Sequence, residues 1–301
     1  MPGYRFCRSD DIALLAHAMN CCVVVHTPEL APLSVDDFKR EIRELDVWCS
    51  SCMVVSAERE PIGVIVGAKR ERETLIHSVG VHPDHQRRGY ASHLLESLSQ
   101  KLAVLGPPRI VAEVPSDLPA ACALFESLGY EAEMQFADFT LSEPLPASAM
   151  TSEVARAGLD DLLGCGALDP PAARSWERAV PTLQNRKDQL QGLAIASDSR
   201  VEAHALFRDL PGPDGHERRE IVSLGRQESR ADSGAEPGGD DATDAHILLE
   251  IVIRAACQTG RTVFVPRISS EEVSWAQLES LGFWKSRTYT RYAAIPDSNT
   301  G

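Results

Sequence analysis

Residues 74–92 read TLIHSVGVHPDHQRRGYAS, and this stretch decides how the rest of the chain is interpreted. A β-branched run ends at Val81, a polar turn containing Pro83 follows, and a helix-like segment opens at Gly89. The first turn of a helix has unpaired amides at the positive end of the macrodipole, and these attract anions, above all phosphates. The stretch therefore predicts a strand, a turn and a helix that together bind an anion.

The residues at the predicted helix start suit this role. Gly89 lets the backbone approach a phosphate without a Cβ atom, and Ala91 has the next smallest side chain. Arg87 and Arg88 add local positive charge to a chain whose net charge is −14. A diphosphate is the ligand that this combination favours.

The surrounding sequence predicts an α/β fold with a mixed sheet. Apolar periodicity, capping residues and turn residues place the elements of the first half. In chain order they are a strand over 4–7, helices over 12–20 and 34–45, strands over 53–57, 62–68 and 74–81, a helix over 89–104, a strand over 109–114, a helix over 119–128, and one long strand or a strand pair over 130–141.

The second half repeats the first. Leu94–Glu96 recurs as Leu248–Glu250, and Arg109–Pro115 as Arg261–Pro266. Glu126–Tyr130 recurs as Glu279–Phe283, and all three matches have offsets between 151 and 154 residues. A repeat of this length predicts two tandem domains, over residues 1–145 and 150–295, joined by a linker at 144–149.

The motif resembles that of a known superfamily. Gln86-x-x-Gly89-x-Ala91 after a strand that ends in Val79-Gly80-Val81 is similar to the acetyl-CoA signature Q/R-x-x-G-x-G/A of the GNAT N-acetyltransferases. The segment from Ala121 to Tyr130 fits the same family, and the resemblance covers most of residues 4–141. It implies acetyl-CoA as cosubstrate and direct acetyl transfer to a primary amine of a small-molecule or peptide acceptor.

The resemblance also implies the cofactor-binding residues. Backbone groups of the Val79 to Val81 strand end would pair with the pantetheine arm, and amides of the following loop would hold the pyrophosphate. The residues implied in this way are Val79, Gly80, Val81, Gln86, Arg87, Arg88, Gly89, Tyr90, Ala91, Ser92 and Phe125.

The usual proton-transfer residues of the family are missing. Leu75 occupies the position of the usual basic glutamate, and Phe125 that of the usual acidic tyrosine. His77 resembles a strand histidine of serotonin N-acetyltransferase and is the candidate catalytic base, because an imidazole titrates near neutral pH. A structural histidine in a half-buried strand is the alternative. Another group or water could protonate the thiolate, or the thiolate could leave unassisted.

The second half lacks the motif. Residues 226–244, at the place of the phosphate loop, hold six acids against two arginines. Such acids at the start of the helix expected over 245–257 would repel phosphate. This degenerate domain is therefore not expected to bind acetyl-CoA productively, in a layout similar to that of mycothiol synthase. It would shape the acceptor pocket or cover the sheet edge.

Composition limits the partners. The net charge of −14 disfavours nucleic acid and anionic membranes. No apolar stretch approaches the roughly 20 residues of a membrane span, and no signal peptide opens the chain, so a cytoplasmic location is expected. The charge also conflicts with aminoacyl transfer from charged tRNA. A monomer that is a pseudo-dimer of repeats, or a homodimer, is expected.

Two further alternatives remain at the level of sequence. The eight cysteines include Cys49 and Cys52 in a C-x-x-C arrangement, which zinc could use, although buried reduced thiols without a metal are the favoured interpretation. Because the usual glutamate and tyrosine are absent, a catalytically weak or inactive CoA-binding sensor or scaffold competes with the enzyme.

Overall fold

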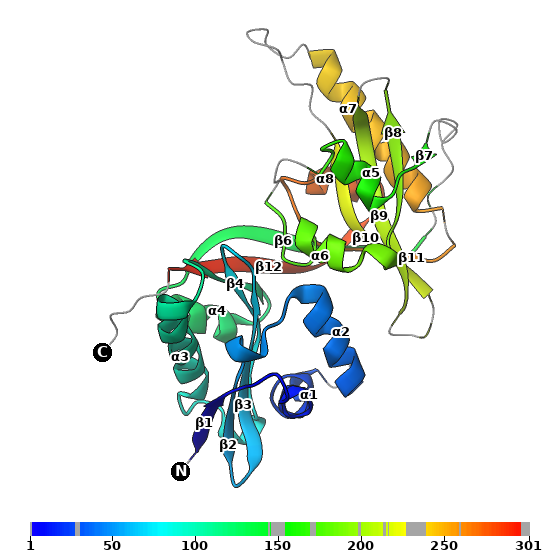
Figure 1. Ribbon diagram of the computed structural model, residues 1–301. Coiled ribbons are helices and arrows are strands. Elements are labelled where there is room, and N and C mark those ends of the chain that lie inside the picture. The colour runs from blue at the N-terminus through cyan, green and yellow to red at the C-terminus, as the bar shows by residue number, and fades with distance from the viewer. Residues whose placement is uncertain are drawn as a thin grey trace. The chain divides into compact units, whose positions relative to one another are not determined.

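The computed structural model describes residues 2–27, 31–143, 145, 154–168, 173–197, 200–212, 215, 217–226, 239–258 and 260–295. The chain divides into two compact units, of which unit 1 comprises Met1–Met134 with Tyr289–Gly301 and unit 2 comprises Gln135–Thr288. Each unit combines a mixed sheet with helices (Figure 1). The predicted α/β fold is thereby confirmed.

Unit 1 follows the predicted order of elements. These are β1 (Gly3–Phe6), α1 (Ile12–Cys22), the 3₁₀ turn η1 (Val24–His26), α2 (Val35–Leu45), η2 (Cys49–Ser51), β2 (Met53–Ala57), β3 (Glu60–Lys69), β4 (Thr74–Val81), η3 (Pro83–His85), α3 (Tyr90–Leu105), β5 (Ile110–Pro115), α4 (Pro119–Ser127) and the start of β6 (Glu131–Leu141). The expected cap of α2 is present, since the Ser34 side chain accepts a hydrogen bond from the Asp37 amide.

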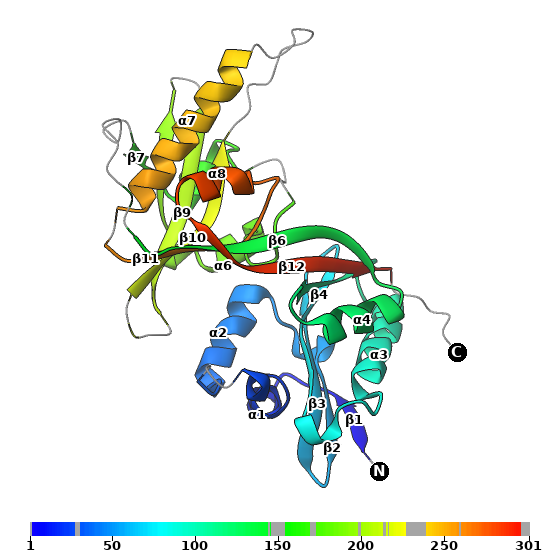
Figure 2. The same cartoon turned by 180° about the vertical axis from the view of Figure 1, so that it is seen from behind.

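The sheet of unit 1 separates two pairs of helices. Its strand order is β1-β2-β3-β4-β5-β12, and β4 and β5 run parallel. Helices α1 and α2 cover one face, and α3 and α4 cover the other (Figures 1 and 2). The apolar stripe of α3 is fully buried against the sheet through Leu94, Leu95, Leu98 and Leu102. This burial fixes the orientation of the helix that begins at the predicted phosphate loop.

Strand β12 (Trp284–Ala294) begins in unit 2, and its residues from Tyr289 onward belong to unit 1. Its second part pairs antiparallel with β5, from Tyr289 opposite Pro115 to Ala294 opposite Ile110. In the same way the second part of β6 belongs to unit 2 and pairs with β11. Each of the strands β6 and β12 thus begins in one compact unit and ends in the other. The consecutive ranges 1–145 and 150–295 did not predict this. Those ranges stay a prediction about the two sequence modules.

Unit 2 repeats the element order of unit 1. Its elements are β7 (Ala155–Arg156), α5 (Leu159–Gly164), α6 (Val180–Asn185), η5 (Lys187–Gln189), β8 (Gln191–Ala196), β9 (Val201–Pro211), β10 (Glu217–Arg226), α7 (Gly239–Ala256), β11 (Thr262–Ser269) and α8 (Trp275–Ser280). The strand order is β6-β11-β10-β9-β8-β7, with β10 and β11 parallel. Helix α7 begins at Gly239, earlier than the predicted 245, and residues 227–238 of the acidic loop lie outside the described residues.

Within the described ranges, no helix combines the length and the apolar character needed to cross a bilayer. The eight cysteines are free thiols. Of the C-x-x-C pair, Cys52 is buried as expected and Cys49 is half-buried. Cys7, Cys22 and Cys257 are also buried, and Cys165 is exposed.

Candidate active site

Strands β4 and β5 separate from each other in the middle of the unit 1 sheet. Their parallel register runs from Thr74 opposite Ile110 to Ile76 opposite Ala112. On the other side of β4, Val66 pairs with Ser78 and Gly67 with Ile76, so His77 is the extra residue of a β-bulge. A bulge bends its strand and ends regular pairing. The bulge at His77 therefore lies where the pairing of β4 with β5 ends, and the unpaired stretch of the two strands beyond it is called the opening.

Past the bulge, Val79 and Val81 turn their backbone groups toward this opening. The His82 amide donates to the Ile62 carbonyl at 3.0 Å, and the register continues with Val81 opposite Gly63 and Val79 opposite Ile65. Hydrogen-bonded and non-hydrogen-bonded pairs alternate along an antiparallel ladder. The amides of Val79 and Val81 consequently point away from β3, toward the side of β5.

Gly80 lies between these two valines, and its Cα is on the face of the sheet that packs against α1. A Cβ atom at this position would stand 2.2 Å from the Cys22 carbonyl oxygen, at the end of α1. The close packing of α1 against β4 therefore explains why residue 80 is glycine. Unlike its neighbours, Gly80 pairs with Val64 of β3 and does not direct its amide toward the opening.

Helix α3 begins immediately beyond the opening. Its N-cap is Gly89, at φ 81° and ψ 1°, and the first intrahelical bond is donated by the His93 amide to the Gly89 carbonyl at 3.0 Å. The amides of Tyr90, Ala91 and Ser92 precede that bond and are the free donors of the first turn. No atom lies within 4 Å of a Cβ built on Gly89. The helix start is therefore open on its outer side, and its left-handed backbone favours glycine.

The loop before α3 supplies charge and a strained residue. Gln86, Arg87 and Arg88 are exposed, and Arg87 adopts a φ of 60°. Left-handed backbone at a non-glycine residue is uncommon and costs energy, and it is enriched at functional sites. The Arg88 guanidinium donates to the Asp84 carbonyl at 3.1 Å, which holds the loop in shape.

His26 and Gln86 anchor the end of β4. The His26 Nε2 donates to the Val81 carbonyl at 3.0 Å, and the Gln86 side-chain amide lies 3.3 Å from the same nitrogen. The Val81 carbonyl at the opening is thus already hydrogen-bonded to His26 of η1. No pattern in the sequence indicated that the His26 side chain reaches β4.

His77 faces α2. Its Nε2 lies 3.8 Å from the Glu41 Oε2, and the two side chains are 16% and 38% exposed. Because of the bulge, Ile76 and Val79 both pack with the α3 side of the sheet, whereas His77 lies on the α2 side. The structure thus gives the candidate base a carboxylate neighbour that sequence spacing did not reveal.

Phe125 lies in the core of unit 1 and is 2% exposed. Its ring is stacked on the Tyr292 ring at a centroid distance of 5.9 Å, and it meets the Tyr130 ring edge-on at 5.2 Å. A phenyl ring has no proton to donate. Two phenols, those of Tyr130 and Tyr292, lie beside it, and the Tyr292 hydroxyl donates to Glu126 at 2.8 Å.

Burial and the hydrogen bond to Glu126 raise the pKa of Tyr292. The phenol therefore stays protonated at neutral pH. Sequence reasoning missed Tyr292 because it lies in β12, far from the motif, and the packing of that strand in unit 1 was not foreseen.

The matching opening in unit 2 is filled by an arginine. The register of β10 and β11 ends at Glu220 opposite Phe264, and beyond it the Arg178 Nη1 donates to the carbonyls of Ile221 and Pro266, at 2.8 and 3.2 Å. Arg178 and its partner Glu272 are both fully buried, with Nε 3.0 Å from the carboxylate. One guanidinium thus bridges the two strands where those of unit 1 leave an opening.

The described titratable side chains form no group that could hold a metal ion. Among the residues that the structure describes, no three His, Cys, Asp or Glu side chains lie close enough to hold a metal ion. This finding covers His77, His82 and His85 as well as the cysteines at 49 and 52.

The comparisons with known proteins agree with this geometry. Residues 17–130 match the model of the acetyltransferase (GNAT) family. An acetyltransferase of Photorhabdus laumondii is 35% identical over 127 residues, which are 42% of this chain and 85% of that protein. The chain belongs to the GNAT family and is an acyltransferase.

Solved structures share the fold of the whole chain. A tandem GNAT protein from the clavulanic acid biosynthesis pathway matches with a TM-score of 0.62 at 14% identity, over 100% of both chains. A GCN5-related N-acetyltransferase from Sphaerobacter thermophilus matches with a TM-score of 0.64 at 16% identity, over 99% of this chain and 98% of the other. The tandem GNAT layout predicted from the internal repeat is confirmed.

Proposed function

We propose that unit 1 transfers the acetyl group of acetyl-CoA to a primary amine of a small-molecule or peptide acceptor. One observation carries this proposal: the outward-facing amides of Val79 and Val81 lead directly to the uncapped first turn of α3. An extended pantetheine arm can pair with a strand edge, and a pyrophosphate can accept from the amides of a helix start.

Residues Gln86 to Ser92 would hold the pyrophosphate. Gly89 and Arg87, both with positive φ, would bend the loop so that successive amides converge on the pyrophosphate. Such alternation of left- and right-handed backbone forms an anion-binding concavity. The exposed guanidiniums of Arg87 and Arg88 offset the negative charge of the chain at this place.

His77 would remove the proton from the acceptor ammonium. It lies at the β4 bulge, where the opening begins, and on the face covered by α2. Glu41 at 3.8 Å can orient the ring and stabilise its charged form after proton transfer. The amine would then attack the acetyl carbon, and the thiolate would leave with a proton from solvent or unassisted.

Unit 2 would support unit 1 without binding acetyl-CoA. The buried Arg178–Glu272 pair lies where a pantetheine arm would have to enter between β10 and β11. Removing one member of such a pair leaves a buried charge, which is strongly unfavourable. Displacement of Arg178 by a cofactor is therefore disfavoured, in addition to the loss of the Gly-containing motif.

Acetyl transfer can be tested by mass spectrometry of the products formed from acetyl-CoA and a panel of amines. Mass detection avoids thiol reagents, which would also react with the exposed Cys165 of the chain. We expect an acetylated amine and free CoA in equal amounts. Binding of CoA without product from any amine or peptide would contradict turnover and favour a sensor role.

A further inference from the structure

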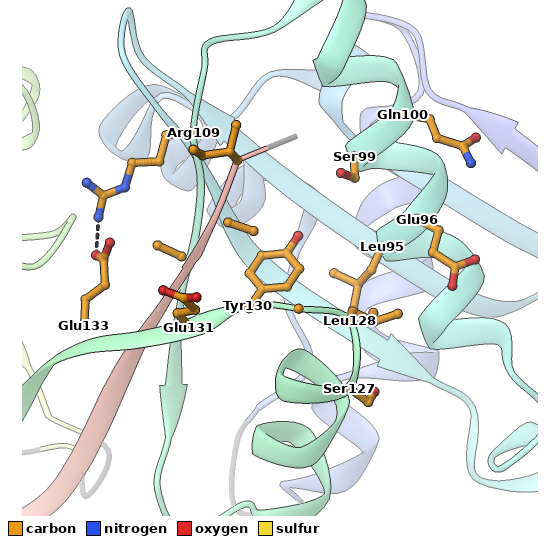
Figure 3. A pocket seen from close by; sticks show the side chains of 14 residues that line it. Leu95, Glu96, Ser99, Gln100, Arg109, Ser127, Leu128, Tyr130, Glu131 and Glu133 are labelled. Carbon is orange, nitrogen blue, oxygen red and sulfur yellow. Dashed lines mark hydrogen bonds and ion pairs between the residues drawn. The ribbon is translucent and has the colours of Figure 1, made fainter. Parts of the chain in front are cut away.

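A pocket of about 990 Å³ lies in unit 1 away from the start of α3 (Figure 3). It is lined by the middle of α3, the residue before β5, the end of α4 with the following turn, the start of β6 and the end of β12. None of the residues assigned above to acetyl-CoA or to proton transfer lines it. The pocket is therefore a separate feature of the unit.

A buried phenol points into this pocket. Tyr130 is 6% exposed, and within the described part of the chain its hydroxyl has no hydrogen-bond partner. Figure 3 shows the hydroxyl directed between the end of β12 and Ser99 of α3. An unpaired buried hydroxyl destabilises a fold, so its presence requires an explanation.

The chain itself shows that the hydroxyl is not needed for packing. The internal repeat places Phe283 of unit 2 at the position of Tyr130, and Phe283 is 2% exposed in the core of unit 2. The aromatic ring alone therefore completes the core at this position. Burial raises the pKa of Tyr130, so the phenol keeps its proton and can both donate and accept a hydrogen bond.

The charges around the pocket favour a cation. Arg109 forms an ion pair with Glu133, which neutralises both (Figure 3). Glu96 on α3 and Glu131 at the start of β6 also line the pocket, and among the described residues neither has a cationic partner. Leu95 and Leu128 provide apolar surface beside them. Two carboxylates with an apolar wall and one phenol suit a short aliphatic chain with an ammonium at each end.

We propose that this pocket binds a linear aliphatic diamine through the Tyr130 hydroxyl and the carboxylates of Glu96 and Glu131. The phenol oxygen accepts from one ammonium, and the carboxylates pair with the charges at the two ends. This site does not depend on the acetyl-CoA assignment, because it uses residues in the middle of α3 and none of those at its start.

The direct test is calorimetric titration of the full chain with 1,4-diaminobutane in the absence of acetyl-CoA. We expect saturable binding that weakens about tenfold in Tyr130→Phe and in Glu131→Gln, the effect of losing one hydrogen bond or charge partner. Glu58→Gln, which removes the same charge from the β2–β3 turn, is the matched control and should bind as the unmodified chain does.

The proposal would be overturned by an absence of saturable binding, by equal affinity of Tyr130→Phe and the unmodified chain, or by preferential binding of glutarate, an anion of similar length. Loss of diamine binding in Gly89→Glu would instead place the diamine in the transfer site and would also overturn it. Urea unfolding gives an independent check, because Tyr130→Phe should be as stable as the unmodified chain or more stable.

Discussion

The hydroxyl of Tyr292 donates a 2.8 Å hydrogen bond to the Oε1 of Glu126, 166 residues earlier in the chain, and thereby attaches β12 to α4 within unit 1. The Tyr292 ring is 3% exposed and stacked on Phe125. The part of β12 that follows unit 2 in sequence is thus part of the core of unit 1.

We expect this contact to stabilise unit 1 strongly. Tyr292→Phe should lower the free energy of unfolding by about 1 kcal/mol, the value of one hydrogen bond. Tyr292→Ala should lower it by about 3–5 kcal/mol because it also leaves a cavity. Urea unfolding followed by circular dichroism measures both. A Tyr292→Ala protein with an unchanged midpoint would show that β12 does not belong to the core of unit 1.

Gly89→Glu should abolish the binding of CoA. The new side chain brings a negative charge to the open helix start and a Cβ to a φ of 81°, which disfavours side chains. Calorimetric titration with CoA measures the effect. Gly166→Glu, at a φ of 70° with no neighbour within 4 Å of its Cβ, is the control for strain and charge. Unchanged affinity in Gly89→Glu would refute the phosphate site.

Replacement of His77 should change the pH dependence of acetyl transfer. His77→Ala should lower the rate about 100-fold or more near pH 7 and much less at high pH, where the acceptor amine is already neutral. Glu41→Gln should cause a smaller loss, because it only removes the group that orients the ring. Steady-state rates from pH 6 to 10 measure both. Identical pH profiles for His77→Ala and the unmodified chain would show that His77 is not the base.

The Arg178–Glu272 pair should show strong coupling. Arg178→Met leaves a fully buried carboxylate without its partner and should cost about 3–5 kcal/mol. The double variant Arg178→Met/Glu272→Leu should recover most of that loss, because no unpaired charge remains. Urea unfolding of the four proteins gives the coupling energy. Additive effects of the two single changes would contradict a mutually dependent pair.

Unit 2 should lose stability in mild acid through His204. Burial, with contributions from Arg174 and Arg178, lowers the pKa of this imidazole to about 3. The unfolded chain takes up a proton near pH 6.5 and the folded chain does not. Stability is therefore complete above about pH 6.5 and falls as the pH decreases, by about 3 kcal/mol at pH 4.

The comparison variant for this prediction is His204→Gln. Glutamine does not titrate, so its stability should depend less on pH between 6.5 and 4. Urea midpoints at several pH values measure the difference, and equal slopes for the two proteins would contradict the assignment.

Much of unit 1 could be predicted from local sequence. Ser34 and the acidic residues after it identify the start of α2, and the leucines of α3 identify its buried face. The candidate phosphate loop could also be predicted, because a glycine between a strand and a helix is a local signal. Each of these features depends on residues within one or two turns of each other.

Other features depend on contacts that no local pattern contains. The position of β12 beside β5 is decided by pairing across the chain, so the role of Tyr292 could not be inferred from its neighbours. The bulge at His77 and the approach of Glu41 likewise follow from the packing of β3 and α2 on β4. Arg178 was not singled out because its partners Ile221, Pro266 and Glu272 lie 43 to 94 residues away.

The placement of β12 has a consequence for biosynthesis. While the ribosome is still producing unit 2, β5 has its register with β4 on one side but lacks the antiparallel partner that Tyr289–Ala294 later provide. An exposed strand edge can pair with other chains, and contacts across such a long sequence separation form slowly. The nascent first module should therefore need protection from aggregation until translation has passed residue 294.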